Sequence, residues 1–461
     1  MNKPRLIIIG LDCAPPRLIF DLWRKELPCL NQLISSGIHG NLRSSDPPIT
    51  IPAWTSMLSG KSPAELGFYG FKTRRPGTYF EHELVTSQAI RHKRVWDYLA
   101  DIGKKSILLG IPQTFPAMPI NGNLVSCFLT PSVDSNCTYP PELKAELLNI
   151  CPNYSFDVPH FRTDRKQEIF DALISSMNDH FKFFRYLLET KDWDFAMMVE
   201  IGTDRLQHCF WNDWDPQHPL HDPNSLFKNA MFDYYKSLDQ ELQKVVDAYG
   251  SDNYLMIVSD HGAKSMYGAI ALNEWLIEKG YLSLNEYPTK TTPIAKCSVN
   301  WSKTKAWAEG GYFGRLYFNI EGREPSGHMP AAEYKTFQTK IRTEIESILG
   351  VSQATLKTKT FTAEELYGFK TAEAPDLFVY FDDLSYRCLG SIGGKNIACL
   401  ENDMGPDGAN HDYEGILIMK GPGISPNEIP RPNLKLIHVA ATALACYGIE
   451  SPPTISQKFP L

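Results

Sequence analysis

Short apolar runs alternate with longer amphipathic segments along much of the chain, and this alternation predicts the secondary structure. The apolar runs are short and partly β-branched, which is typical of strands buried on both faces of a sheet. Strands are expected at residues 6–9, 40–43, 105–111, 195–200, 254–259 and 415–419. Helices are expected at residues 28–37, 94–102, 166–189, 227–248 and 436–447. This order predicts a three-layer, doubly wound α/β fold with a mostly parallel sheet covered on both faces.

The pattern changes between residues 264 and 402, where polar and aromatic stretches separate shorter periodic segments. Within this part of the chain we expect helices at 272–279 and 332–349 and strands near 316–320 and 376–381. We interpret residues 264–402 as a cap-like inserted subdomain. The catalytic core is then discontinuous, and it comprises residues 1–263 and 403–461.

Composition narrows the class of protein. The chain has 461 residues, of which 43% are hydrophobic and 21% charged, as in ordinary soluble proteins. A net charge of -7 argues against a nucleic-acid polymer as partner, and no apolar run approaches the roughly 20 residues of a membrane span. The apolar stretch 6–11 is shorter than a signal-peptide core of about 7–15 residues. Ten scattered cysteines without a CxxC pair indicate a reducing compartment, so we expect a cytoplasmic protein.

Polar side chains follow three of the expected strands. Asp12 follows the strand at 6–9, Asp204 follows the strand at 195–200, and Asp260 and His261 follow the strand at 254–259. In a parallel sheet the carboxyl ends of the strands share one edge, where ligands bind. His208 lies four residues after Asp204, and this spacing places both on one helical face. These groups could therefore meet at one site.

Thr50 lies in the segment PPITIPAW, just before a helix expected to begin near Pro52. The start of a helix stabilises an anion through its free N–H groups and its dipole. A hydroxyl is a weak nucleophile unless a base or a metal activates it. Thr50 could instead serve only as a helix cap. Thr55 and Ser56 are rival hydroxyls, but they fall within the helix and are expected to face the core.

The other clusters also have plain structural interpretations. Asp12 could cap a helix or form an Asx turn, and the Asp260 segment could be a polar turn. His411 has Asp412 and Glu414 beside it as alternative ligands. Taken together, the groups outnumber the three or four ligands of one zinc ion and suit a two-metal site. The seven residues are Asp12, Thr50, Asp204, His208, Asp260, His261 and His411.

In their order and local sequence these clusters resemble the alkaline phosphatase superfamily. The Thr-Ile-Pro-Ala…Ser-Gly…Pro…Gly pattern at 50–67 is similar to the nucleophile segment of nucleotide pyrophosphatases and phosphodiesterases. Nearly the whole chain resembles a prokaryotic branch described as predicted phosphohydrolases or phosphomutases. The shared segments are LNEWLIEKGYL at 272–282, NIEGREPSG at 319–327, APDL at 374–377 and GPDGANH at 405–411.

The resemblance implies two divalent metal ions. One would be held by Asp204, His208 and His411. The other would be held by Asp12, Asp260 and His261 together with the Thr50 oxygen. Zinc is the metal expected from the family, and carboxylate ligands leave manganese as the alternative.

The chain departs from the family pattern at two positions. Ala53 stands where the phosphodiesterases usually have an Asn that contacts a phosphoryl oxygen, so that contact is expected from a backbone N–H near Ile51 or from Arg205. Cys13 stands where Gly is frequent, and the sequence offers no interpretation of it. Arg205, Trp54 and Lys264 are the candidate substrate contacts. Exposed cations are usually solvated and most aromatic side chains lie in the core, which is the alternative for all three.

The sequence thus predicts a metal-dependent phosphoester hydrolase, either a phosphodiesterase or a phosphatase, that forms a phospho-threonine intermediate on Thr50. The expected substrate is a small-molecule phosphate or phosphonate ester. A phosphomutase or phosphotransferase on the same scaffold is the first alternative. A non-catalytic metal-binding scaffold is the second, although loss of ligands is the usual mark of that class and none is missing.

Overall fold

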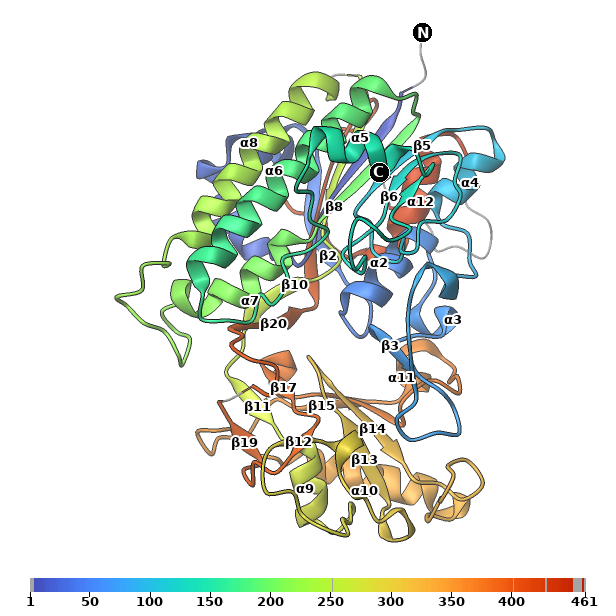
Figure 1. The fold of residues 1–461 in the computed structure, drawn as a ribbon, viewed down its shortest axis with the longest axis vertical. Coiled ribbons are helices and arrows are strands. Elements are labelled where there is room, and N and C mark those ends of the chain that lie inside the picture. The colour runs from blue at the N-terminus through green and yellow to red at the C-terminus, as the bar shows by residue number, and fades with distance from the viewer. Residues whose placement is uncertain (1–3, 251, 401, 428, 451–457, 460–461) are drawn as a thin grey trace.

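The computed structural model describes residues 4–250, 252–400, 402–427, 429–450 and 458–459. The chain forms two parts stacked along the long axis of the molecule (Figure 1). The larger part contains a nine-stranded sheet between helices, and the smaller part contains several short sheets.

The central sheet is mostly parallel. Seven of its nine strands point the same way, and β21 and β7 run opposite to them. The antiparallel direction of β21 was not part of the sequence prediction. The strand order is β22 (Leu434–Lys435), β2 (Ile38–Arg43), β21 (Glu414–Lys420), β9 (Tyr254–Val258), β1 (Leu6–Leu11), β8 (Phe195–Glu200), β5 (Ser106–Leu109), β6 (Gly122–Val125) and β7 (Thr138–Tyr139).

Helices cover both faces of this sheet (Figure 1). Alternate residues of β1 point to opposite faces, so Ile7 and Ile9 join one apolar core while Leu6 and Ile8 join the other. The first core is closed by α1 (Pro28–Ser36), α6 (Lys166–Thr190), α7 (Gly202–Trp214) and α8 (Ala230–Tyr249). The second is closed by α2 (Thr50–Ser59), α4 (Val95–Asp101) and α12 (Val439–Ala445). The predicted three-layer α/β fold is confirmed.

The smaller part has a core of its own, formed largely by residues between Ile270 and Ile392. Its main sheet has the order β13 (Ala306–Glu309), β14 (Gly314–Phe318), β16 (Leu377–Tyr380) and β15 (Lys359–Phe361). Its helices are α9 (Leu272–Glu278), α10 (Tyr334–Glu346) and α11 (Ala363–Tyr367). Short strands complete it at β11 (Gly268–Ile270), β12 (Thr292–Pro293), β17 (Tyr386–Cys388), β18 (Ser391–Ile392) and β19 (Ala398–Cys399).

An early segment of the chain also packs against this smaller part. It contains α3 (Pro63–Leu66), β3 (Lys72–Arg74) and β4 (His82–Leu84). Tyr79 stacks on Trp301 with ring centroids 3.5 Å apart, and His82 Nε2 lies 2.6 Å from Glu309 Oε1. The two parts are thus joined by side chains as well as by the chain crossings. The boundaries at 263 and 403 stay a prediction.

The start of α2, which bears on the position of Thr50, differs from the expected one. Helix α2 begins at Thr50, with Ile49 as its cap, whereas the sequence predicted a start near Pro52. The proline occupies the third helical position, where its missing N–H is still outside the helical hydrogen-bond pattern. Thr50 therefore belongs to the first turn instead of preceding it, and its side chain is not the cap.

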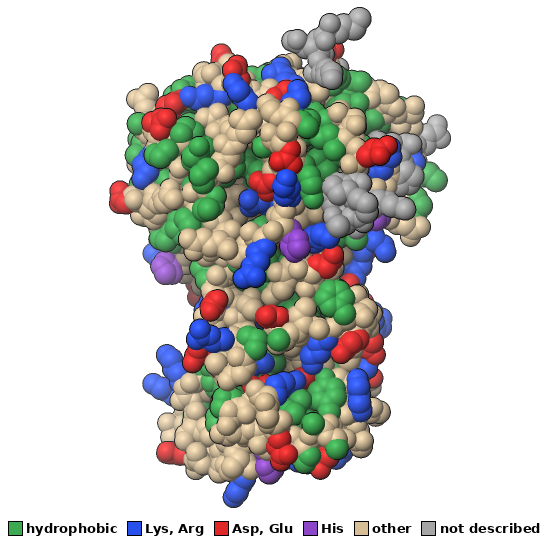
Figure 2. Space-filling model, turned by 90° about the vertical axis from the view of Figure 1, so that its right-hand side faces the viewer, with side chains coloured by type: hydrophobic (Ala, Val, Ile, Leu, Met, Phe, Trp, Pro, Cys, Tyr) green, Lys and Arg blue, Asp and Glu red, His purple; other side chains and the backbone are tan. Residues whose placement is uncertain are grey.

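Among the described residues, no helix has both the length and the apolar character needed to span a membrane. The face shown in Figure 2 carries acidic and basic side chains interspersed over both parts of the molecule.

Candidate metal centre

The register of the central sheet brings Asp12 and Asp260 to the same level. Gly10 of β1 pairs with Val258 of β9, and each aspartate lies two residues beyond its member of that pair. Both strands point the same way, so both carboxylates leave the same edge. Asp12 and Asp260 are fully buried there.

His411 reaches this edge by a different route. It lies in β20 (Ala409–Asp412), which pairs with β10 (Gly262–Ser265) in an antiparallel ribbon. The chain then enters β21, which runs antiparallel to β9. The amino end of an antiparallel strand lies beside the carboxyl ends of its neighbours. A residue that precedes β21 therefore meets residues that follow β1 and β9.

Helix α7 supplies Asp204 and His208 from one face, as their spacing predicts. His208 Nε2 lies 3.3 Å from Asp204 Oδ1. His411 Nε2 lies 3.7 Å from the same oxygen. The three side chains expected to hold one ion are thus adjacent.

His261 lies at the centre of the other set. Its Nε2 is 3.3 Å from Thr50 Oγ1, 3.3 Å from Asp260 Oδ2 and 3.6 Å from Asp12 Oδ1. The imidazole rings of His261 and His411 stack with centroids 3.9 Å apart, which joins the two sets. All seven residues singled out in the sequence therefore converge on one buried site.

Each histidine is held with Nε2 facing the site. The Nδ1 atoms of His261 and His411 lie 3.1 Å and 2.8 Å from the carbonyl oxygens of Gly262 and Pro48. A carbonyl only accepts, so Nδ1 carries the proton and Nε2 keeps its lone pair. His208 Nδ1 also faces acceptors, a buried carboxylate oxygen at 2.8 Å and a carbonyl oxygen at 3.2 Å. Burial lowers the pKa of His208, but the Asp407 and Asp204 carboxylates outweigh it and raise the pKa to about 9, so Nε2 also carries a proton until a cation replaces it. Histidines that bind metals are oriented in this way.

Four buried acceptor atoms at the site have no hydrogen-bond partner among the described residues. They are Asp12 Oδ1, Asp204 Oδ1, Asp260 Oδ2 and His411 Nε2. Buried polar atoms are normally paired, and a bound cation would provide the partner that these four atoms lack. Asp12, Asp260 and His261 offer ligand atoms within 4.8 Å of one another, as do Asp204, His261 and His411 with Cys13. Carboxylates and imidazoles fit zinc, and the carboxylates also suit manganese.

The electrostatics of the site also favour cations. Burial raises the pKa of Asp12 and of Asp260, and the neighbouring carboxylates raise both further. Burial lowers the pKa of His261 to about 4, so its imidazole is neutral near pH 7. Burial raises the pKa of Asp204, but the charge of His208 outweighs it and the net direction is down. Carboxylates that resist ionisation for lack of nearby positive charge are stabilised when a cation binds between them.

The sequence profile of the type I phosphodiesterase / nucleotide pyrophosphatase family matches residues 6–413. The chain belongs to this family. Its members are phosphoester hydrolases, and the expected relation to the alkaline phosphatase superfamily is confirmed. Among curated proteins, no sequence matches the chain.

The solved structures of similar fold include those of two proteins described below. Phosphonoacetate hydrolase from Sinorhizobium meliloti 1021 is 15% identical in its complex with phosphonoformate and 14% identical in its complex with phosphonoacetate, with TM-scores of 0.60 and 0.62. Each alignment covers 96% of both chains. Human ectonucleotide pyrophosphatase / phosphodiesterase 5 is 10% identical with a TM-score of 0.58, over 99% of this chain and 97% of that one. These likenesses confirm the fold over almost the full length.

In this phosphodiesterase-family chain the Trp54 side chain contacts a candidate metal ligand, Asp12. Its indole N–H donates to Asp12 Oδ2 at 2.7 Å, and its side chain is fully buried. The far end of the ring lies so close to Gly10 that a Cβ there would be 2.3 Å from it. The structure gives the Trp54 indole a buried position beside Asp12, and substrate contact by Trp54 stays a prediction.

The two cations predicted to touch substrate are both engaged by carboxylates. Arg205 donates to both oxygens of Asp157, at 2.8 Å each, and to Asp204 Oδ2 at 2.6 Å. Lys264 Nζ lies 2.8 Å from Asp412 Oδ1. In the β10–β20 ribbon, His411 pairs with the residue before Lys264, so the two side chains point to opposite faces. Substrate contact by either cation stays a prediction.

Three residues that the sequence did not assign to the site surround His208. Asp407 accepts from His208 Nδ1, and Arg162 pairs with Asp407 at 2.8 Å. Tyr312, from the smaller part of the molecule, places its hydroxyl 3.0 Å from His208 Nε2 and stacks on His411 at 3.9 Å. Asp407 lies within the GPDGANH segment, so the family resemblance pointed at it without giving it a role.

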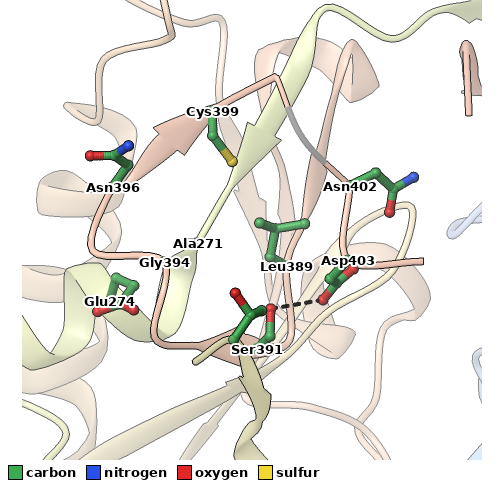
Figure 3. Close-up of a pocket in the computed structure, with 10 residues that line it drawn as sticks. Ala271, Glu274, Leu389, Ser391, Gly394, Asn396, Cys399, Asn402 and Asp403 are labelled. Carbon is green, nitrogen blue, oxygen red and sulfur yellow. Dashed lines mark hydrogen bonds between the residues drawn. The ribbon is translucent and has the colours of Figure 1, made fainter. Parts of the chain in front are cut away.

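A separate cavity of about 450 Å³ lies in the smaller part, beside α9 and β11 (Figure 3). Glu274, Ser391 and Asp403 face it, and Ser391 Oγ donates to Asp403 Oδ2 at 3.1 Å. None of the seven candidate ligands lines it.

Proposed function

We propose that this protein hydrolyses small phosphate or phosphonate esters through a phospho-threonine intermediate on Thr50, with two divalent metal ions. The observation that carries the proposal is the position of the Thr50 hydroxyl. It lies 3.3 Å from His261 Nε2, among six buried carboxylate and imidazole groups. Family membership supplies the reaction class, and the geometry supports Thr50 as the nucleophile.

The ions are assigned to two sets of residues. Asp204, His208 and His411 would hold one ion, and Asp12, Asp260 and His261 would hold the other beside Thr50. When bound, two such ions lower the pKa of a hydroxyl and neutralise the charge that develops on phosphoryl oxygens. Zinc is the metal proposed first, because three imidazoles contribute, and manganese is the alternative.

Thr50 attacks phosphorus in line with the leaving group. The bond from phosphorus to the ester oxygen breaks as the Oγ–P bond forms, the Oγ proton leaves to solvent, and the departing oxygen takes up a proton from solvent. Water then attacks phosphorus, releases the phosphoryl group and returns the hydroxyl to Thr50. The first turn of α2 leaves backbone N–H groups without intrahelical partners, including that of Ile51, and these favour the negative oxygens.

Two side chains beside the candidate ligands, Tyr312 and Arg162, support a small anionic substrate. Tyr312 and Arg162 lie over the ligands, and an Arg162 N–H donates to the Tyr312 hydroxyl. Arg162 is also paired with Asp407, so these two side chains offer hydrogen-bond donors, not net positive charge, to the oxygens of a small anionic substrate. The phosphonoacetate hydrolase structures of similar fold hold phosphonoformate and phosphonoacetate, which supports phosphonates as candidates.

The decisive variant is Thr50→Ala, with Thr55→Ala as its control. Thr55 is equally buried in the next turn of α2, where its hydroxyl donates to the carbonyl of Ile51. We expect Thr50→Ala to lose turnover and to keep its metal content, while Thr55→Ala retains activity. Near-normal turnover by Thr50→Ala would show that another group is the nucleophile. The substrates to compare are p-nitrophenyl phosphate, bis-p-nitrophenyl phosphate and a phenylphosphonate ester, each with Zn²⁺ or Mn²⁺.

A phosphomutase or phosphotransferase remains the second candidate. It is favoured by Tyr312, which reaches the site from residues 264–402 and could help to exclude water from a phospho-enzyme. The intermediate on Thr50 would then pass its phosphoryl group to a second hydroxyl. Product analysis with a sugar phosphate distinguishes transfer from release of inorganic phosphate. Metal analysis that finds no bound ion would instead support a non-catalytic scaffold.

We also propose a cytoplasmic location. The ten cysteines of the chain are scattered along the sequence without a CxxC pair, which suits a reducing compartment. Fractionation of cells that produce the untagged protein tests this.

A further inference from the structure

Cys13 occupies a backbone conformation that side chains rarely adopt. It follows Asp12 at the end of β1 with φ at 58°, in the left-handed region. A residue other than glycine costs free energy there, and such positions cluster at functional sites. The side chain is fully buried. Glycine would adopt this backbone conformation at a lower cost in free energy. The presence of cysteine therefore indicates that the thiol has a role besides packing.

The main chain around Cys13 is fixed by the site itself. Its N–H donates to Asp260 Oδ1 at 3.3 Å, and the next N–H, of Ala14, donates to Ser259 Oγ at 2.9 Å. Thr203 Oγ1 donates to the carbonyl of Asp12 at 2.6 Å. These bonds hold the turn from both sides, so the direction of the Cα–Cβ bond of Cys13 is fixed.

The sulfur points among the candidate ligands. Cys13 Sγ belongs to a group whose ligand atoms all lie within 4.8 Å of one another, with Asp204, His261 and His411 as the other members. Two atoms of this group, Asp204 Oδ1 and His411 Nε2, are buried and have no hydrogen-bond partner among the described residues. The thiol itself donates weakly to the carbonyl of Gly262, at 3.3 Å.

We propose that Cys13 supplies a thiolate ligand to the ion held by Asp204 and His411. This inference rests on the metal centre of the proposed function and adds a ligand to it. With His208 the donor set is one carboxylate, two imidazoles and one thiolate, which zinc accepts with a metal–sulfur distance of about 2.3 Å. The thiol proton leaves to solvent when the ion binds, because only the thiolate is a ligand.

A thiolate changes which metal the site prefers. Sulfur is a soft ligand that favours zinc and cobalt, whereas manganese prefers oxygen. Carboxylates and imidazoles alone left zinc and manganese as alternatives. With Cys13 as a ligand the ion beside Asp204 and His411 is zinc in preference to manganese.

Cobalt(II) provides a direct test, because thiolate ligation gives a sulfur-to-cobalt charge-transfer band in the near ultraviolet that oxygen and nitrogen ligands do not give. Metal-free full-length protein is titrated with cobalt as wild type, Cys13→Gly and Cys13→Ser. Cys13→Gly suits the positive φ and is expected to fold, and Cys13→Ser keeps the size of the side chain. Cys127→Ser is the control, since Cys127 is also buried but lies outside the group.

We expect the charge-transfer band in the wild type and the control, and its loss in both Cys13 variants while the visible cobalt bands remain. Zinc affinity should fall by about tenfold or more in Cys13→Gly, with a smaller change for manganese. Visible cobalt bands without a charge-transfer band in the wild type would overturn the role of Cys13 and leave the metal centre intact. Failure of the wild type to bind cobalt or zinc at all would overturn the proposed metal centre itself.

Discussion

Substitution of Asp407 is the strongest test of how the candidate metal ligands are positioned. Asp407 would act on a bound ion only by orienting the His208 imidazole. Its Oδ1 accepts from His208 Nδ1 at 2.8 Å, and the carboxylate is fully buried. The adjacent imidazolium and guanidinium groups hold the pKa of Asp407 well below its usual range even though burial raises it. Asp407→Ala removes this acceptor, whereas Asp407→Asn can still accept through its amide oxygen.

The size of the effect follows from the role of the bond. Loss of a partner that orients a metal-binding histidine costs about 10- to 100-fold in affinity, or about 1.4–2.7 kcal/mol. The lower end is expected for Asp407→Asn, whose amide oxygen still accepts from His208. The upper end is expected for Asp407→Ala, which leaves His208 Nδ1 only the carbonyl of Ala409, a weaker acceptor 3.2 Å away. Arg162 also loses its partner, so folding stability falls as well and affinity is the quantity to compare.

Zinc affinity is measured by competition with a chromophoric chelator on folded, metal-free protein. Asp403→Asn is the control, because Asp403 lies four residues away and contacts Ser391, not His208. Asp407→Ala with wild-type zinc affinity would refute the reasoning, since it would mean that Asp407 does not orient His208 or that His208 is not a ligand.

Three further predictions test other contacts. Trp54→Phe leaves Asp12 without its indole donor and should lower the free energy of unfolding by about 1–3 kcal/mol in denaturant titrations; an unchanged midpoint would contradict this. Tyr312→Phe keeps the ring but removes the hydroxyl, so kcat should fall by about tenfold or more at unchanged metal content, and equal kcat would exclude a role for that hydroxyl. Burial lowers the pKa of His180, but the Glu200 carboxylate 2.9 Å away outweighs it and the net direction is up. The His180–Glu200 pair therefore stabilises the fold fully at pH values below about 6.5, the pKa of histidine in the unfolded chain. This stabilisation is lost as pH rises through the raised pKa of the folded state. His180→Gln should therefore lower the free energy of unfolding more at about pH 6 than at about pH 9.

The fold was largely predictable because its central strands are buried on both faces. The expected strand at 195–200 coincides with β8, and the one at 254–259 exceeds β9 by a single residue. The direction of β21 could not be predicted in this way, because a buried run reads the same whichever way it pairs. Helix α2 starts two residues early because proline is tolerated anywhere in the first turn, which makes it a loose marker of the start.

The seven candidate residues were found because most follow apolar runs or share a helical spacing. Asp407 and Tyr312 carry no such signal. Asp407 precedes the two-stranded β10–β20 ribbon, and Tyr312 lies in the connection between β13 and β14, which belong to a separate sheet. Their roles depend on tertiary contacts to His208 that no local pattern records. Cys13 was visible as an unusual residue, but its backbone angle and the direction of its sulfur appear only in three dimensions.

The central claim is that Thr50 carries the phosphoryl group during turnover. The most direct measurement is an acid quench of the metal-loaded enzyme during steady-state hydrolysis, followed by mass spectrometry of the peptide that contains residue 50. We predict a phosphoryl group on Thr50 in the wild type and none in the Thr50→Ala variant, which should also be inactive. An active enzyme whose Thr50 stays unmodified, with direct attack of water shown by inversion at a chiral phosphorus, would contradict the account.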